Sequence, residues 1–265
     1  MLVLRLSHRG VAAAAALACL AGTGCAAPAG TASVAASATG SSVRVAPSTP
    51  PPGSRPDRVS PLRDRSGLHP GLTAVPPAEL GSARAQIRRV AVAPRVDAPG
   101  YDREAGFGPA WTDAVDVTWG RDGCKTREQI LHRDLKAIDF RAGTRDCVVL
   151  GGILQEPYTG RTIEFSKSRP QEVQIDHVIP LSFAWDHGAA RWSASKRLRL
   201  AGDPLNLLAV DGAANQSKSD SGPSAWLPQN RPVHCAYAVR FALVARKYGV
   251  TASAADRRTM LRACA

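Results

Sequence analysis

The large apolar side chains of this chain are confined to its second part. All five Trp, four Tyr and five Phe residues lie within residues 101–265, whereas residues 31–100 contain none of them and hold 11 of the 20 prolines. A segment without large apolar side chains buries too little surface to offset the entropy lost when its backbone is ordered. We therefore predict a disordered linker over residues 30–82. Residues 83–265 then form one domain, long enough for a single core.

The start of the chain is typical of an export signal. A basic stretch precedes an apolar run over residues 11–21, which is too short for a membrane-spanning helix of ~20 residues. Small residues follow, and we predict a signal peptide over residues 1–29. The Gly-Cys pair ending at Cys25 also resembles a bacterial lipoprotein cleavage site, so a lipid anchor at Cys25 is an alternative to free secretion. Either route predicts an extracellular location and no transmembrane segment in the mature chain.

Four cysteines lie in the predicted domain: Cys124, Cys147, Cys235 and Cys264. An even number of cysteines in an exported chain indicates disulfides. Three connectivities are compatible with the sequence. We favour Cys124–Cys147 and Cys235–Cys264, because each pair brackets one local helical segment. No Cys-x-x-Cys motif is present, so a structural zinc site is not indicated.

Apolar periodicity predicts short strands amid helices, which is the α+β class. Apolar residues recur at helical spacing in several segments, whereas β-branched runs bounded by turn residues are typical of strands. Residues 86–92 fit either a short helix or a strand at the start of the domain. We expect helices over residues 126–137, 181–187, 235–248 and 253–263, and strands over residues 147–154, 162–165, 173–179 and 205–210.

Two short polar stretches carry residues suited to phosphodiester hydrolysis. Asp176 and His177 end an apolar run, and a later stretch holds Asn215 and, one helical turn on, Lys218. Such hydrolysis needs a water, a group that accepts its proton, and positive charge on the phosphate. We therefore predict His177 as the base, because imidazole titrates near neutral pH, and Lys218 as a phosphate contact. Asp176 and Asn215 offer oxygen ligands to Mg²⁺, which keeps several waters and needs few protein ligands.

The charge of the chain is compatible with an anionic partner. The formal net charge is +12, and one stretch of the predicted domain is rich in basic residues. Basic patches attract anionic polymers such as nucleic acids. A solvated helical face explains the same stretch equally well. The basic residues of this stretch are Arg191, Lys196, Arg197 and Arg199.

Three motifs in order extend this pattern into a family resemblance. They are Ile-Asp-His-Val-Ile-Pro-Leu at 175–181, Asp-Pro-Leu-Asn-Leu-Leu at 203–208 and Asn-Gln-Ser-Lys-Ser-Asp at 215–220. Together they resemble the HNH (ββα-metal) endonucleases, and above all an exported bacterial branch related to the nuclease domain of GmrSD-type restriction systems. Stretches at 101–103, 122–128 and 158–163 are similar to that branch too. The resemblance therefore covers about residues 83–264.

The resemblance implies a fold and a role for each motif residue. His177 is the implied general base, while Asp176 and Asn215 are the implied ligands of one divalent ion. Asn206 takes the middle position of the HNH motif and supports the loop that carries the histidine. Asn215 stands where histidine is usual, which favours Mg²⁺ or Mn²⁺ over softer metals. The implied fold is a ββα-metal core with additional helices, and the implied substrate is DNA, or RNA, cleaved with little sequence preference.

Two other functions are compatible with the sequence. A non-catalytic, disulfide-stapled extracellular module could bind an anionic polymer, in which case Asn215 would serve only as a helix cap and Lys218 as a solvated surface residue. A zinc hydrolase would need a third strong ligand near His177. The sequence offers only His187, which we expect at the surface, or His234, and neither has suitable spacing.

Overall fold

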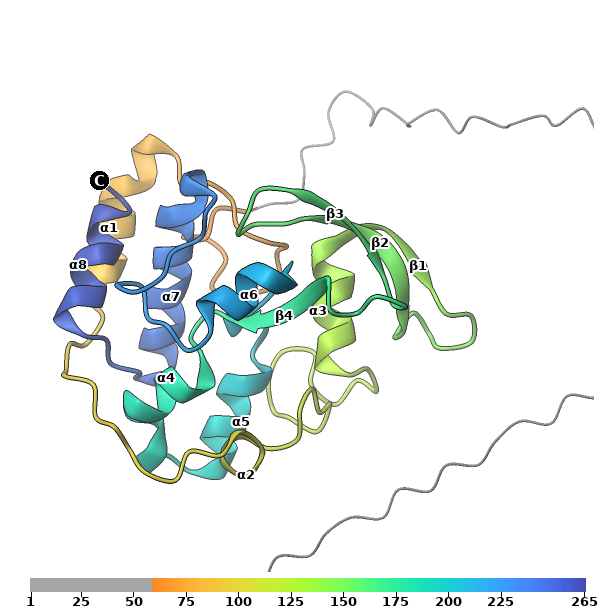
Figure 1. The fold of residues 1–265 in the computed structure, drawn as a ribbon, viewed down its shortest axis with the longest axis horizontal. Coiled ribbons are helices and arrows are strands. Elements are labelled where there is room, and N and C mark those ends of the chain that lie inside the picture. Colours follow the sequence, from red (N-terminus) through yellow and green to blue (C-terminus); the bar gives the residue numbers. More distant parts are fainter. Residues whose placement is uncertain (1–58) are drawn as a thin grey trace, which may run out of the picture. The chain divides into compact units, whose positions relative to one another are not determined.

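A computed structural model describes residues 59–265 of the chain. The predicted signal peptide, Cys25 and the first part of the predicted linker lie outside the described residues. The described part is built from helices and two small antiparallel sheets (Figure 1), so the α+β class is confirmed. No helix within residues 59–265 combines the length and apolar character needed to cross a membrane.

Eight α-helices, four short 3-10 helices and five strands make up the described residues. The α-helices are α1 (Leu80–Arg88), α2 (Arg103–Phe107), α3 (Thr126–Asp134), α4 (Leu181–Asp186), α5 (Ala194–Gly202), α6 (Gly212–Lys218), α7 (His234–Tyr248) and α8 (Ala254–Arg262). The 3-10 helices are η1 (Pro77–Glu79), η2 (Ala189–Arg191), η3 (Pro204–Asn206) and η4 (Arg231–Val233). The strands are β1 (Leu135–Phe140), β2 (Val149–Gln155), β3 (Thr162–Ser166), β4 (Val173–His177) and β5 (Leu207–Asp211).

The smaller sheet separates two hydrophobic clusters. It consists of β4 and β5, which pair antiparallel with Asp176 opposite Leu208 and His177 opposite Leu207. Because side chains alternate along a strand, Leu208 and Val210 of β5 enter one cluster, whereas Leu207 enters the other. Every residue of β5 is therefore buried, and the pair forms a rigid base for the residues at its ends.

Helix α3 lies between the two sheets (Figure 1). Its Ile130 and Leu131 are fully buried in the cluster that also contains residues of β2, β3, β4 and β5. The helix predicted over residues 126–137 is too long, since α3 ends at Asp134 and Leu135 begins β1. Leu135 pairs with Leu154 of β2, and this strand pairing overrides the helical spacing of the apolar residues.

Helix α7 forms the centre of the larger cluster, where α1 and α8 pack against it (Figure 1). Both predicted disulfides form. Cys235 at the start of α7 joins Cys264 beyond the end of α8, with Cα atoms 4.6 Å apart. Cys124 joins Cys147 with Cα atoms 5.1 Å apart, and this link fastens the start of α3 to the segment before β2.

Part of the predicted linker belongs to the folded unit. Leu72 is 2 % exposed and lies in the larger cluster. Asp64 is also buried, and its carboxylate lies 3.5 Å from the guanidinium of Arg240 on α7. The linker predicted over residues 30–82 is therefore wrong for residues 59–82. Aliphatic side chains and a buried ion pair order this segment, although it has no aromatic residue.

Candidate functional site

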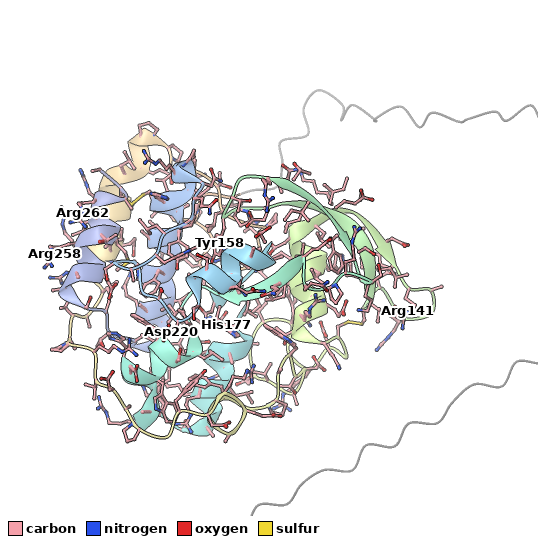
Figure 2. All side chains as sticks on the ribbon, in the orientation of Figure 1. Arg141, Tyr158, His177, Asp220, Arg258 and Arg262 are labelled. Carbon is pink, nitrogen blue, oxygen red and sulfur yellow. A yellow bond between two sulfur atoms is a disulfide. The ribbon has the colours of Figure 1, made fainter. Side chains whose placement is uncertain are left out.

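The end of β4 carries an open pocket of about 420 Å³ that three of the predicted site residues line together: Asp176, His177 and Asn215. The β4–β5 pair leads directly into α6, which supplies Asn215. The long connection between the two strands holds α4, η2 and α5. Figure 2 shows His177 near the centre of the described part, close to Asp220, which lines the same pocket. Consecutive side chains of a regular strand point to opposite faces, but β4 ends at His177. Asp176 and His177 can therefore both line the same pocket.

The imidazole of His177 is held on one side by a main-chain carbonyl. Its Nε2 lies 3.0 Å from the carbonyl oxygen of Ala201 on α5. A carbonyl only accepts hydrogen bonds, so Nε2 carries the proton and Nδ1 is left as the basic nitrogen. The ring of Trp111 stacks nearly parallel to the imidazole, with centroids 5.6 Å apart. The ring is thus fixed in both orientation and tautomer.

The environment of His177 keeps its side chain neutral at pH 7. Burial lowers the pKa of His177 to about 3, and the nearby positive charges of Arg103 and Lys218 act in the same direction. The hydrogen bond to Ala201 opposes this shift, since it favours the protonated ring. A neutral imidazole with a free Nδ1 can accept a proton from water.

The carboxylate of Asp176 is buried and bonded on both oxygens. Oδ1 accepts a hydrogen bond from Lys218 Nζ at 2.8 Å, and Oδ2 accepts one from the Tyr158 hydroxyl at 2.6 Å. Burial raises the pKa of Asp176, and the ammonium of Lys218 opposes the rise. Burial also lowers the pKa of Lys218, while Asp176 raises it. Each charge of the pair therefore compensates the cost of burying the other.

Lys218 does not lie where the sequence suggested. Its side chain is 0 % exposed, and besides Asp176 it bonds the carbonyl oxygen of His177 at 2.8 Å. The predicted contact with a substrate phosphate is wrong for this arrangement, as is the solvated surface position. The cause is that the face of α6 carrying Lys218 packs against β4, whose buried carboxylate attracts the ammonium.

Asn215 presents an oxygen to the pocket. Its Nδ2 donates to Oε1 of Gln174 on β4 at 2.9 Å, and its Oδ1 accepts no hydrogen bond from residues 59–265. Asn215 is not a helix cap, because Asp211 caps α6 by accepting from the amide of Ala214 at 2.8 Å. The amide oxygen is thus available to a ligand in the pocket.

Asn206 lies away from the pocket and is fully buried. Its Oδ1 accepts from the amide of Ile179 at 2.8 Å, and its Nδ2 donates to the carbonyls of Ile179 and Leu200 at 3.3 Å. Its own carbonyl accepts from the amide of Val178 at 2.7 Å. These bonds join the two residues after His177 to η3 and to α5.

The donor set of the pocket fits a hard divalent ion. The Asp176 carboxylate and the Asn215 amide oxygen line it together, and Mg²⁺ uses few protein oxygens while keeping waters. Within residues 59–265, no three His, Cys, Asp or Glu side chains gather as a metal site. Nor can the histidines considered for zinc complete one. His187, expected at the surface, is buried against Phe183, and His234 bonds a main-chain carbonyl.

Three residues of the site were not assigned from the sequence. Tyr158 bonds Asp176, and Arg103 and Trp111 line the pocket. Tyr158 and Arg103 stand in stretches whose similarity to an exported nuclease branch was visible, but no role followed from it. The four basic residues of the stretch from Arg191 to Arg199, which lie in η2 and α5, do not line the pocket. Instead, Arg197 donates to the carbonyl of Gly106 at 2.6 Å and so fastens α2.

Comparison with protein-family models identifies the family. The family model of the GmrSD restriction endonucleases, C-terminal domain, matches residues 125–263. The chain is 32% identical over 188 residues to a protein of Arthroderma benhamiae described as an uncharacterized secreted protein, in an alignment covering 69% of this chain and 85% of that protein. No solved structure matches. Since the matched residues include β4, β5 and α6 and more than half of the chain, the protein belongs to the family of GmrSD restriction endonuclease C-terminal domains.

Proposed function

We propose that this protein is an extracellular, metal-dependent HNH endonuclease that hydrolyses phosphodiester bonds of DNA, with RNA as the alternative substrate. One observation carries the proposal: a neutral histidine, whose Nδ1 has no hydrogen-bond partner within residues 59–265, shares a pocket with two oxygen donors suited to a hard cation. The β4–β5–α6 order supports a ββα-metal core. Membership of a family of restriction endonuclease domains supports a nucleic acid substrate.

In the proposed reaction, His177 Nδ1 accepts a proton from the attacking water. The Ala201 carbonyl, bonded to Nε2, stabilises the imidazolium that forms. Asp176 and Asn215 would hold one Mg²⁺ or Mn²⁺ ion, which when bound supplies positive charge to the phosphate and the leaving oxygen. Asn206 keeps the segment after His177 in place, so its role is positional.

Several observations support secretion. Two disulfides form within the described residues, and such links persist in oxidising compartments. The Arthroderma relative is described as secreted. The predicted signal peptide over residues 1–29 and the alternative lipid anchor at Cys25 both lead outside the cell. Mass spectrometry of the mature N-terminus distinguishes cleavage after Ala29 from a lipidated Cys25.

A plasmid digestion tests the proposed activity. Purified mature protein with Mg²⁺ is expected to convert supercoiled plasmid to nicked and linear forms, and chelator should stop the conversion. His177→Ala should lose at least about 100-fold in rate, as expected when a general base is removed. His132→Ala is the matched control, because His132 is exposed and does not line the pocket. Digestion that survives His177→Ala unchanged contradicts the mechanism, and salt-sensitive binding without cleavage supports a binding module instead.

A further inference from the structure

The pocket needs a cation for the phosphate, and the buried Lys218 does not provide it. Lys218 is 0 % exposed and bonded to Asp176. Of the Lys and Arg side chains in residues 59–265, only Arg103 lines the pocket, together with His177 and Asn215. We propose that Arg103 is the phosphate-binding residue of this site and contacts the backbone of the nucleic acid next to the scissile bond. The proposal rests on the proposed function.

The guanidinium of Arg103 is oriented by one main-chain contact and keeps further N–H donors for a ligand. One nitrogen of its guanidinium donates to the carbonyl of Gly108, at the other end of α2. No carboxylate within residues 59–265 forms an ion pair with it. A guanidinium has five N–H donors in a planar fork, so the remaining donors can bind two phosphate oxygens at once. An unpaired, half-buried arginine at the edge of an open pocket is therefore ready for an anion.

Helix α2 holds Arg103 at this edge with its own contacts. Asp102 caps the helix by accepting from the amide of Ala105 at 2.7 Å. Phe107 is fully buried in the larger hydrophobic cluster, and the carbonyl of Gly106 accepts from Arg197 of α5. Since α5 also carries Ala201, which holds His177, the same helix positions both the arginine and the proposed base.

The segment around Arg103 also brings aromatic rings to the pocket. Tyr101 is 41 % exposed and lines it, and Trp111 covers one face of His177. Trp111 has a φ of 58°, a left-handed conformation that is strained for a bulky residue. Such strain is concentrated at functional sites. An arginine beside an exposed aromatic ring such as that of Tyr101 can bind a nucleotide backbone while a base stacks on the ring.

The segment that brings Arg103 and the two aromatic rings to the pocket lies outside the residues matched by the family model. The matched residues begin at 125, whereas Tyr101, Arg103 and Trp111 precede them. Asp220 is the exposed acid of the pocket, and Asp176 is already neutralised by Lys218. Arg103 therefore supplies the positive charge that a phosphate would meet on entering the pocket.

Two substitutions of Arg103 test the proposal. Arg103→Gln retains a side-chain donor for Gly108 but loses the charge, and Arg103→Lys keeps the charge without the fork. Arg141→Gln is the matched control, because Arg141 is exposed and lies at the far edge of the three-stranded sheet from His177 (Figure 2). Thermal unfolding of each variant is measured first, so that a folding defect is recognised.

Binding is measured by fluorescence anisotropy of a labelled DNA duplex, in chelator and over a range of salt concentrations. Cleavage of the same duplex is then measured with Mg²⁺. Arg103→Gln should weaken binding about tenfold and reduce the slope of log affinity against log salt by about 1, with a higher KM in cleavage. Arg103→Lys should fall between this variant and the wild type, and Arg141→Gln should stay within about twofold of the wild type.

The two proposals fail in different ways. If Arg103→Gln binds and cleaves like Arg141→Gln, the phosphate role of Arg103 is wrong while the nuclease stands. If the wild type binds DNA without cleaving it, the proposed function fails, and the binding comparison still decides on Arg103. Wild-type protein that neither binds nor cleaves the duplex overturns both.

Discussion

Two buried clusters of charge differ in what they face. In the first, the guanidinium of Arg133 donates to the carbonyls of Gly67 and Pro204 at 2.7 and 2.8 Å and pairs with Asp134. In the second, the ammonium of Lys218 bonds Asp176. Both cations are buried and paired, but only Asp176 lines the pocket that His177 and Asn215 share; Arg133 and Asp134 line a different one. We call the first the scaffold cluster, because its guanidinium holds main-chain carbonyls of distant segments, and the second the site pair.

The scaffold cluster extends beyond Arg133 to a second buried arginine. Arg240 of α7 donates to the carbonyls of Leu205 and Pro204 at 2.8 and 3.0 Å, and it pairs with Asp64. Both guanidiniums therefore hold the short η3 segment that carries Asn206. The comparison teaches that the scaffold cluster holds the chain under the site, while the site pair is the part that a ligand of the His177 pocket can change.

The largest expected effect is on the scaffold cluster. Asp64→Ala leaves the buried guanidinium of Arg240 without its carboxylate, and losing one partner of a buried pair costs about 3–5 kcal/mol. Urea unfolding of residues 59–265 measures this loss. Glu172→Ala is the control, because its pair with Arg169 is exposed and such pairs contribute about 0–1 kcal/mol. Equal losses in the two variants would mean that the segment before α1 is not part of the cooperative unit.

Lys218→Met tests whether the second pair is open to a ligand. In chelator it should destabilise the protein by about 3 kcal/mol, because Asp176 keeps a buried charge without a partner. Mg²⁺ should recover part of this loss, since an ion that binds only the folded state stabilises it. Lys167→Met is the control: it breaks the pair with Glu128 outside the pocket. A loss in Lys218→Met that does not depend on Mg²⁺ would contradict the fit of a cation to Asp176.

Lys218 also shows how much of the site could be predicted from the sequence. Helical spacing correctly placed it on α6 one turn after Asn215, but spacing does not tell which surface a helix face will meet. Likewise, the apolar run of β4 and the helical pattern of α7 were predicted closely, because burial on a rigid element leaves a period in the sequence.

Contacts between distant segments leave no such period. Tyr158 meets Asp176 across 18 residues, and Arg103 reaches the pocket from an element that precedes the three motifs. The order of residues 59–82 was missed for the same reason. Its Asp64 and Leu72 are held by partners on α7 and in the larger cluster, which no local pattern reveals.

Tyr158→Phe should have a smaller effect than either charge change. It removes the hydroxyl that donates to Asp176 Oδ2 at 2.6 Å and leaves the ring packed. Losing a hydrogen bond to a charged group costs about 1.5–3 kcal/mol, measured by urea unfolding in chelator. Tyr237→Phe is the matched control, because its hydroxyl makes only a long bond of 3.4 Å to a carbonyl. Similar losses for both would mean that Asp176 gains nothing from the tyrosine.

The smallest expected effect concerns Asp256, a buried acid that forms no ion pair with any Lys or Arg of residues 59–265. Asp256 accepts hydrogen bonds from the hydroxyls and amides of Ser224 and Ser253. Burial acts to raise the pKa of Asp256, but these bonds outweigh it and the pKa lies below its ordinary value, in contrast to Asp176. A lowered folded pKa gives stability that is present above the unfolded value of about 3.9 and is lost as the pH falls through the folded value. Thermal unfolding between pH 6 and pH 2.5 should therefore show a loss in the wild type that Asp256→Asn lacks. If the stability of the wild type and of Asp256→Asn declines in parallel, the acid sensitivity belongs to other carboxylates. The contrast between the neutral donors that bind Asp256 and the ammonium that binds Asp176 would then no longer hold.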